Sequence, residues 1–184
     1  MTLTKTPICD FGKKAESFSL KSTENKTVSL NDVRGKNGTL IMFICNHCPY
    51  VKAVIDDIVN DSNILKKEGI NFLAIMSNDV KNYPEDSFEN MISFSKLHNF
   101  SFPYLIDDTQ KIAKDYDAVC TPDFFGYNKN LELQYRGRIR ELKDLKPVSQ
   151  GDSDLRTAMK LVATSGKGPK NQIPSMGCNI KWFK

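Results

Sequence analysis

The chain has 184 residues, a length typical of one domain whose hydrophobic core is large enough to fold without disulfide bonds. Its 26 basic and 22 acidic side chains give a formal net charge of only +4, and no basic block alternates with aromatic residues, so we expect no nucleic-acid partner. The N-terminus lacks the apolar run of a signal peptide, and no stretch is long enough to span a membrane. We therefore expect a cytoplasmic protein with no membrane partner.

The first predicted elements are a hairpin and a buried strand. The first fifteen residues show no periodic pattern and are expected to be irregular. Two short alternating runs at 17–20 and 27–30 flank a polar turn, which is typical of an N-terminal β-hairpin, and a short bend at 31–35 follows. The stretch 38–44 is almost continuously apolar, which predicts a central strand buried on both faces.

A Cys-x-x-Cys motif follows this strand directly, within the sequence FICNHCPY at 43–50. Apolar residues then recur at helical spacing over 51–59, and Pro49 suits the first turn of such a helix because a missing N–H costs little there. Gly69 lies just beyond the expected helix end, and 70–76 predicts a second buried strand. This βαβ unit should have parallel strands and a right-handed crossover.

The rest of the chain continues the α/β pattern. The further predicted elements are a helix at 84–98, a strand at 104–106, a short helix at 110–116, a hairpin with strands at 124–127 and 132–136, and a helix at 154–164. We therefore expect an α/β protein with a central mixed β-sheet flanked by helices, formed as one domain by residues 1–164. Residues 165–184 should form an extended tail that packs on the domain, because its apolar side chains are costly to leave in water.

The chemistry is expected at Cys45 and Cys48. A helix N-terminus stabilises a thiolate through its dipole and its unpaired N–H groups. We predict that Cys45, just before the helix, is the more exposed attacking thiol with a lowered pKa, and that Cys48, in the first turn, is the more buried resolving thiol. His47 as a cation would stabilise a thiolate further, and Asn46 and Pro49 complete the motif that tunes the pKa.

Two other interpretations of the motif remain open at this point: a zinc site, or two inert buried thiols. A zinc site needs further ligands, and the chain has no second Cys-x-x-Cys to offer, so we predict no metal. A second landmark is Thr121-Pro122, an X-Pro step entering a strand. It is a candidate cis peptide bond, although an ordinary trans proline is the commoner case.

Together these features resemble the thioredoxin superfamily, and more narrowly its alkyl hydroperoxide reductase and thiol-specific antioxidant branch. The resemblance covers nearly the whole chain. It is closest to a peroxiredoxin-like group that is similar in CNHCPYVK at 45–52, CTPDF at 120–124 and PSMGCNIKW at 174–182. It implies a thioredoxin-like fold, a redox-active disulfide without a separate cofactor, and Thr121-Pro122 as the cis-proline loop facing the active site.

The departures from true peroxiredoxins concern the groups that bind peroxide. There the peroxide-reacting cysteine aligns with Cys48, a threonine or serine stands at the position of Cys45, and a proline stands at the position of Ile41. The arginine of that site falls near Thr121-Pro122. Two later arginines, Arg136 and Arg138, are interpreted as solvated charges at a strand edge. A buried aspartate that thioredoxin keeps in the preceding strand is also missing from 38–44, so no general base is assigned.

The other three cysteines have open roles. Cys120 would lie close to the active site if the cis-proline interpretation holds, and we favour simple packing over a mixed disulfide. Cys178 is either a resolving thiol that reaches back to Cys45 or a docked structural residue. Cys9 is expected to be a bystander.

The leading hypothesis is thus a cytosolic thiol–disulfide oxidoreductase in which Cys45 attacks a substrate disulfide and Cys48 resolves the mixed disulfide. The alternatives are a peroxiredoxin-like antioxidant peroxidase, and a redox sensor or zinc-binding module on the same fold. Expected partners are protein or small-molecule disulfides, or hydroperoxides, with an electron donor such as the thioredoxin or glutathione system. The protein is expected to be a monomer or a dimer.

Overall fold

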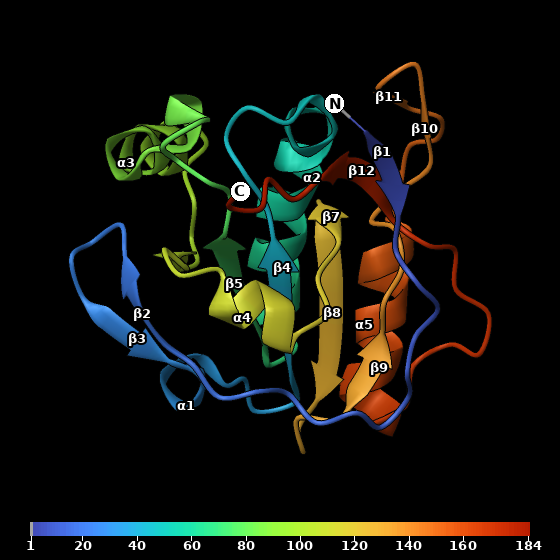
Figure 1. Cartoon of the computed structure of the whole chain (residues 1–184). Coiled ribbons are helices and arrows are strands. Elements are labelled where there is room, and N and C mark those ends of the chain that lie inside the picture. The colour runs from blue at the N-terminus through green and yellow to red at the C-terminus, as the bar shows by residue number, and fades with distance from the viewer. Residues whose placement is uncertain (1) are drawn as a thin grey trace.

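The computed structural model describes residues 2–184, which form a mixed β-sheet with helices on both faces (Figure 1). The main sheet has seven strands in the order β3-β2-β6-β5-β4-β8-β9. These strands are β2 (Ser19–Ser22), β3 (Thr27–Ser29), β4 (Gly38–Phe43), β5 (Ile70–Met76), β6 (Tyr104–Ile106), β8 (Asp123–Asn128) and β9 (Leu133–Tyr135). The helices are α1 (Leu30–Val33), α2 (Pro49–Lys66), α3 (Phe88–Leu97), α4 (Lys111–Asp115) and α5 (Asp154–Ser165).

The centre of the sheet is the predicted βαβ unit. Strand β4 pairs in parallel with β5 and antiparallel with β8, so the sheet is mixed as predicted. All six residues of β4 are buried because helices cover both faces of the sheet. In Figure 1, α4 lies in front of the sheet and α2 behind it. The carboxyl end of β4 leads directly into the Cys-x-x-Cys motif, which is therefore held between a buried strand and a long helix.

Two hydrophobic clusters, one on each face of the sheet, hold these layers together. The first cluster joins α2, α3 and α5 to one face and includes both cysteines of the motif. The second joins α1 and α4 to the other face through residues such as Val33, Ile112 and Tyr116. Because the motif belongs to the first cluster, its geometry is fixed by the packing of the core.

The helix predicted at 84–98 is broken in the structure. A 3₁₀ turn, η1 (Pro84–Asp86), comes first, and α3 then starts after Ser87, whose hydroxyl accepts a hydrogen bond from the Asn90 N–H. Serine is a strong N-cap residue, so it begins a new helix here instead of continuing one. The break leaves Asp86 at the end of the turn, where its side chain is buried.

The two ends of the chain form a second, three-stranded sheet that sequence analysis did not predict. Its order is β1 (Leu3–Lys5), β12 (Met176–Asn179) and β7 (Cys120–Thr121), with antiparallel pairing throughout. The expectation of an irregular N-terminus is therefore wrong for β1. A further unpredicted hairpin joins β10 (Leu142–Lys143) to β11 (Lys146–Pro147). In Figure 1, β12 lies beside β1 close to the start of α2.

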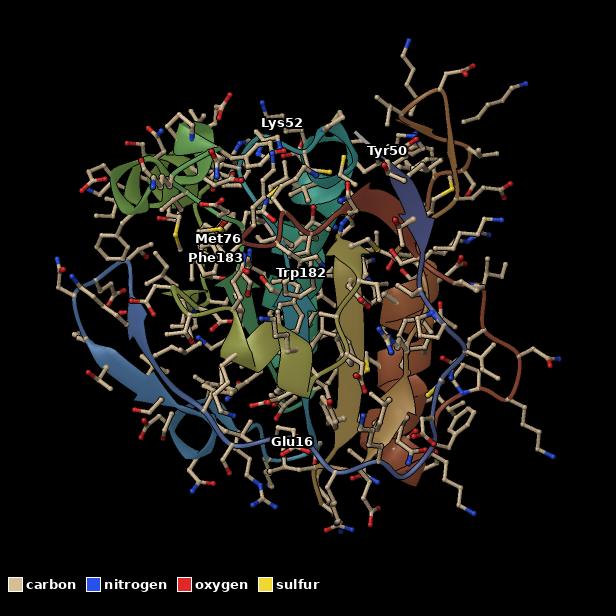
Figure 2. The ribbon with its side chains drawn as sticks, in the orientation of Figure 1. Glu16, Tyr50, Lys52, Met76, Trp182 and Phe183 are labelled. Carbon is tan, nitrogen blue, oxygen red and sulfur yellow. The ribbon has the colours of Figure 1, made fainter. Side chains whose placement is uncertain are left out.

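The C-terminal tail packs only part of its apolar surface. Cys178 and Ile180 are buried, whereas Trp182 and Phe183 keep 38% and 49% of their surface exposed. Figure 2 shows these two aromatic residues in front of the sheet, where Lys114 of α4 lies 5.7 Å from the centre of the Trp182 ring. The domain boundary at residue 164 stays a prediction. Among residues 2–184, no helix combines the length and apolarity that crossing a bilayer requires.

Candidate functional site

The motif sits at the N-terminus of α2. Cys48 is the N-cap residue, with extended backbone angles (φ −66°, ψ 122°), and Pro49 is the first helical residue, as predicted. Cys48 therefore stands just before the first turn of the helix and not within it, where it was predicted to lie. Cys45 precedes Cys48 by three residues and lies outside the helix. The dipole and free N–H groups of α2 therefore act on Cys48 more directly than on Cys45.

Both sulfur atoms are buried, and that of Cys48 lies in contact with a third. Cys45 is 1% exposed and Cys48 is fully buried, so the expected difference in exposure between them is absent. The electrostatics of the site couple the two thiols, with Cys45 as the hydrogen-bond donor toward Cys48. Cys48 Sγ also lies 3.0 Å from Cys178 Sγ, and in its thiol form it donates to the Thr121 carbonyl oxygen at 3.1 Å. Three sulfur atoms thus meet beside the 121–122 loop.

The two thiols of the motif have opposite acidities. The hydrogen bond donated by Cys45 lowers the pKa of Cys48 to about 5, and contacts with Cys178 and the Val51 N–H add to this against the effect of burial. The same hydrogen bond raises the pKa of Cys45, as do its burial and the carboxylate of Asp86. The predicted lowering of the pKa at Cys45 is therefore wrong, because the helix N-terminus and the donated hydrogen bond both favour a thiolate on Cys48.

Asp86 is a site residue that sequence analysis missed. Its side chain is fully buried, and its Oδ1 accepts the backbone N–H groups of Asn46 at 2.8 Å and His47 at 3.3 Å. Its Oδ2 accepts the Asn78 amide at 2.8 Å and lies 2.7 Å from His47 Nδ1. Burial tends to raise the pKa of Asp86, but the hydrogen bonds from His47 and Asn78 outweigh it and hold this pKa below its ordinary value. One carboxylate therefore fixes both the backbone of the motif loop and its histidine.

His47 is positioned by this carboxylate and lies next to Cys45. The hydrogen bond to Asp86 raises the pKa of His47 above its ordinary value, which favours the imidazolium form. The Nδ1 atom lies 3.9 Å from Cys45 Sγ, and the ring stacks on Tyr83 with centroids 5.8 Å apart. The side chain is 16% exposed. His47 can therefore place positive charge beside Cys45, as the sequence suggested for a thiolate of the motif.

Asn46 has a structural part in the loop. Its Oδ1 accepts the hydroxyl of the buried Tyr104 at 2.9 Å, and its Nδ2 donates to the Glu85 carbonyl at 3.1 Å. The side chain thus ties the motif to β6 and to the 3₁₀ turn that carries Asp86. Its amide does not contact the sulfur atoms through any hydrogen bond found among residues 2–184.

The atoms of Cys45, His47 and Asp86 that can bind a metal lie within 4.8 Å of one another. Both oxygens of Asp86 already accept two hydrogen bonds each. Because a carboxylate offers about four lone-pair positions, a metal ion would have to displace one of these donors. The geometry accordingly suits an orienting carboxylate better than a metal ligand.

The second predicted landmark lies directly against the motif. The Thr121-Pro122 peptide bond is cis, as the resemblance implied, and not the commoner trans form. The Thr121 hydroxyl lies 3.4 Å from Cys45 Sγ, so this residue contacts Cys45 through its side chain and Cys48 through its carbonyl. Next to it, Cys120 is buried and its thiol donates weakly to the Pro122 carbonyl at 3.5 Å. Burial raises the pKa of Cys120, as expected for a packing residue.

The remaining predicted residues are Cys9, Arg136 and Arg138, whose contacts differ from those of the three sulfur atoms. Cys9 is partly buried, and desolvation raises its pKa to about 11. Arg136 is not a solvated charge: it is 6% exposed, pairs with the fully buried Asp123 at 3.0 Å and lies over the Phe125 ring. Arg138 is three-quarters buried and pairs with Asp154. The earlier interpretation of both arginines as solvated is therefore wrong, because their partners draw them onto the protein.

A surface hollow of about 420 Å³ borders Pro122. Tyr50 lines it from the start of α2, and Ile173 and Met176 line it from the tail. Figure 2 shows Tyr50 at this end of α2, beside β12. Neither Cys45 nor Cys48 lines the hollow, and both side chains are buried.

Comparison with protein families and curated sequences gives a consistent picture. Residues 11–142 match the AhpC/TSA family. A curated relative is the thiol-disulfide oxidoreductase ResA of Bacillus subtilis strain 168, with 26% identity over 117 residues. That match covers 64% of this chain and 61% of ResA, so the chain spans about three fifths of the relative's length.

Two solved structures resemble nearly the whole chain, and a third resembles about two thirds of it. An uncharacterised conserved protein of Geobacillus kaustophilus has a TM-score of 0.94 and 39% identity, over 100% of this chain and 97% of that one. A hypothetical protein of Sinorhizobium meliloti 1021 has a TM-score of 0.89 and 32% identity, over 97% of both chains. The thioredoxin domain of a thiol-disulfide oxidoreductase from Bacteroides vulgatus has a TM-score of 0.58 and 16% identity, over 68% of this chain and 86% of that one. The predicted thioredoxin-like fold is thereby confirmed.

Proposed function

Because the chain belongs to the AhpC/TSA family and buries two hydrogen-bonded thiols at the start of α2, we propose that it is a thiol–disulfide oxidoreductase whose Cys45 and Cys48 cycle between dithiol and disulfide. The observation that carries this proposal is that the two buried thiols meet at one residue, since Cys45 Sγ lies 3.4 Å from the Thr121 hydroxyl and Cys48 Sγ lies 3.1 Å from the Thr121 carbonyl oxygen. Such a pair can lose two electrons by closing a disulfide without the arrival of another protein group. The sulfur atoms themselves hold the electrons, so the reaction needs no separate cofactor.

The geometry supports roles opposite to those predicted from the sequence. Cys48, with its lowered pKa, is the thiolate in the reduced site and attacks one sulfur of a substrate disulfide. The substrate S–S bond breaks, one substrate sulfur leaves as a thiolate, and a mixed disulfide forms on Cys48. Cys45 then loses its proton, attacks Cys48 Sγ and releases the second substrate thiolate. His47 stabilises the charge on Cys45 at this step, since its Nδ1 lies 3.9 Å from Cys45 Sγ.

The burial of both sulfur atoms favours a small or extended disulfide over a folded protein as substrate. With β12 in place, neither cysteine offers more than 1% of its surface to solvent. A flexible disulfide such as that of oxidised glutathione needs a smaller opening than a rigid protein surface does. The thioredoxin or glutathione system is a suitable electron donor for returning the pair to the dithiol.

A thiol peroxidase is the second candidate, and the thiolate on Cys48 at a helix N-terminus is the observation in its favour. Two observations favour exchange over it. A thiol, Cys45, occupies the position where the resemblance requires a hydroxyl, and Arg136 is paired with Asp123. A peroxide would thus meet a second thiol instead of a polarising arginine, and a sulfenic acid on Cys48 would be trapped by Cys45.

Parallel assays on the wild type, Cys45→Ser and Cys48→Ser test the proposal. We expect the wild type to catalyse reduction of oxidised glutathione and of insulin disulfides by dithiothreitol, with the faster reaction on glutathione. Cys48→Ser should fall to the uncatalysed rate. Cys45→Ser should accumulate a mixed disulfide on Cys48, unless another thiol of the protein resolves it. Turnover of hydrogen peroxide with no disulfide reductase activity would overturn the proposal in favour of a peroxidase.

A further inference from the structure

The C-terminal strand holds a third cysteine against the dithiol. Strand β12 is the middle strand of the three-stranded sheet, so its backbone is fixed on both sides. Cys178 faces Thr121 on one neighbouring strand and Leu3 on the other. Thr121 is the residue that also contacts both sulfur atoms of the motif. The register of β12 on β7 therefore determines where the sulfur of Cys178 lies.

A glycine makes this close approach possible. A Cβ atom on Gly177 would lie 2.0 Å from the Thr121 carbonyl oxygen and 2.7 Å from the Thr121 carbonyl carbon. Ordinary contacts between carbon and a carbonyl oxygen are about 3.3 Å or longer. Residue 177 must therefore be glycine for β12 to sit as close to the cis-proline loop as it does.

The resulting sulfur geometry is close to that needed for a bond. Cys178 Sγ lies 3.0 Å from Cys48 Sγ, and Cys178 is only 3% exposed. A disulfide bond is about 2.05 Å long, so the two atoms need to move roughly 1 Å toward each other. Reacting atoms held about 3–3.5 Å apart are already in a near-attack arrangement. Cys120, on the strand beside Cys178, instead directs its thiol to the Pro122 carbonyl.

We propose that Cys178 is a third redox thiol, which takes over the disulfide from Cys45 by forming a Cys48–Cys178 bond. This inference rests on the proposed function, because it starts from oxidised Cys48. Cys178 loses its proton and attacks Cys48 Sγ; the bond from Cys48 to Cys45, or to a substrate sulfur, breaks. The departing sulfur leaves with the bonding electron pair and takes up the proton. One disulfide is lost and one is formed, so no further oxidant or reductant is needed.

The exchange would carry the oxidising equivalents from the motif into the tail. A Cys48–Cys178 bond ties β12 covalently to the start of α2 and leaves Cys45 as a thiol beside His47. It also resolves a mixed disulfide on Cys48 when Cys45 does not. The sequence had considered Cys178 as a partner of Cys45, whereas the contact in the structure is with Cys48.

Glutathionylation of variants that lack Cys45 tests the inference. Cys45→Ser is treated with oxidised glutathione, quenched by alkylation and mapped by mass spectrometry, beside Cys45→Ser/Cys178→Ser and the matched control Cys45→Ser/Cys120→Ser. We expect a stable glutathione adduct on Cys48 only in the variant without Cys178. The single variant and the Cys120 control should instead form the Cys48–Cys178 disulfide, and their adduct should decay about 100-fold faster. Wild-type protein mapped in the same way should contain some of this disulfide beside Cys45–Cys48.

The outcomes separate this inference from the proposed function. An equally long-lived adduct on Cys48 in all three variants, with no Cys48–Cys178 peptide in the wild type, would overturn the third thiol and leave Cys48 as the nucleophile. Absence of any adduct or disulfide on Cys48 in every protein, the wild type included, would overturn both. Circular dichroism of each variant checks that the fold is intact.

Discussion

Replacement of Gly177 by alanine tests whether the close packing of β12 on β7 holds Cys178 Sγ next to Cys48 Sγ. The new methyl group would lie 2.0 Å from the Thr121 carbonyl oxygen, more than about 1 Å closer than an ordinary contact allows. The neighbouring atoms are backbone and cannot rotate away, so β12 must separate from β7. Overpacking of this kind costs about 1–3 kcal/mol. The shift also moves Cys178 away from Cys48.

Two measurements report these two effects. Urea denaturation should show a loss of about 1–3 kcal/mol in the free energy of unfolding of Gly177→Ala. In the Cys45→Ser background, formation of the Cys48–Cys178 disulfide should slow by about 100-fold, the usual cost of misplacing reacting atoms by about 1 Å. Met176→Ala is the matched control, since Met176 is in the same strand and its side chain is 37% exposed. Unchanged stability together with an unchanged rate in Gly177→Ala would refute the reasoning.

Three further predictions concern buried charges. Cys45→Ala should raise the pKa of Cys48 by about 1–2 units, since it removes a hydrogen bond to a charged group, whereas Cys45→Ser should raise it less. The absorbance of the thiolate as a function of pH measures the pKa of Cys48 in both variants. Equal pKa values in the two variants would contradict the role of Cys45 as the donor. Asp86→Asn should lower the pKa of His47, which NMR titration of the ring measures. Because the folded-state pKa of His47 is raised, its ion pair stabilises the fold below about pH 6.5, and this effect is lost as the pH rises through the folded-state pKa. The difference in the free energy of unfolding between wild type and Asp86→Asn should therefore shrink with rising pH. A difference that stays constant with pH would contradict the ion pair. Arg136→Ala leaves a buried carboxylate unpaired and should cost about 3–5 kcal/mol in denaturant unfolding, and a loss below about 1 kcal/mol would show that the pair is screened.

The sequence was sufficient to predict the parts of the fold that have a local pattern. The buried strand and amphipathic helix around the motif follow from apolar spacing, and 70–76 was predicted with the bounds that the structure shows for β5. The β2–β3 hairpin was also predicted, with its strands displaced by about two residues or fewer. These elements bury most of their own apolar residues, so their periodicity is visible in the sequence alone.

The missing parts depend on contacts between distant residues. Strand β12 pairs with β7 and β1, which are short and have no alternating pattern of their own. Asp86 lies about forty residues beyond the motif in a polar stretch, and only the break after η1 turns it toward the loop of His47. The error over the acidity of Cys45 has a related source, because the interaction with Cys48, burial and the carboxylate of Asp86 all disfavour a thiolate there. A lone acid after Pro-Glu carries no local signal of such a role.

The central claim is that Cys45 and Cys48 form one two-electron redox pair, and equilibration with glutathione redox buffers tests it most directly. Thiols are trapped by alkylation at each ratio of reduced to oxidised glutathione, and each cysteine is quantified by peptide mass spectrometry. The account predicts that the thiols of Cys45 and Cys48 disappear together in a single two-electron transition, with a Cys45–Cys48 disulfide as the main product. If both thiols persist under the most oxidising buffer, or if Cys48 is lost alone to an over-oxidised or stably glutathionylated form, the account is contradicted.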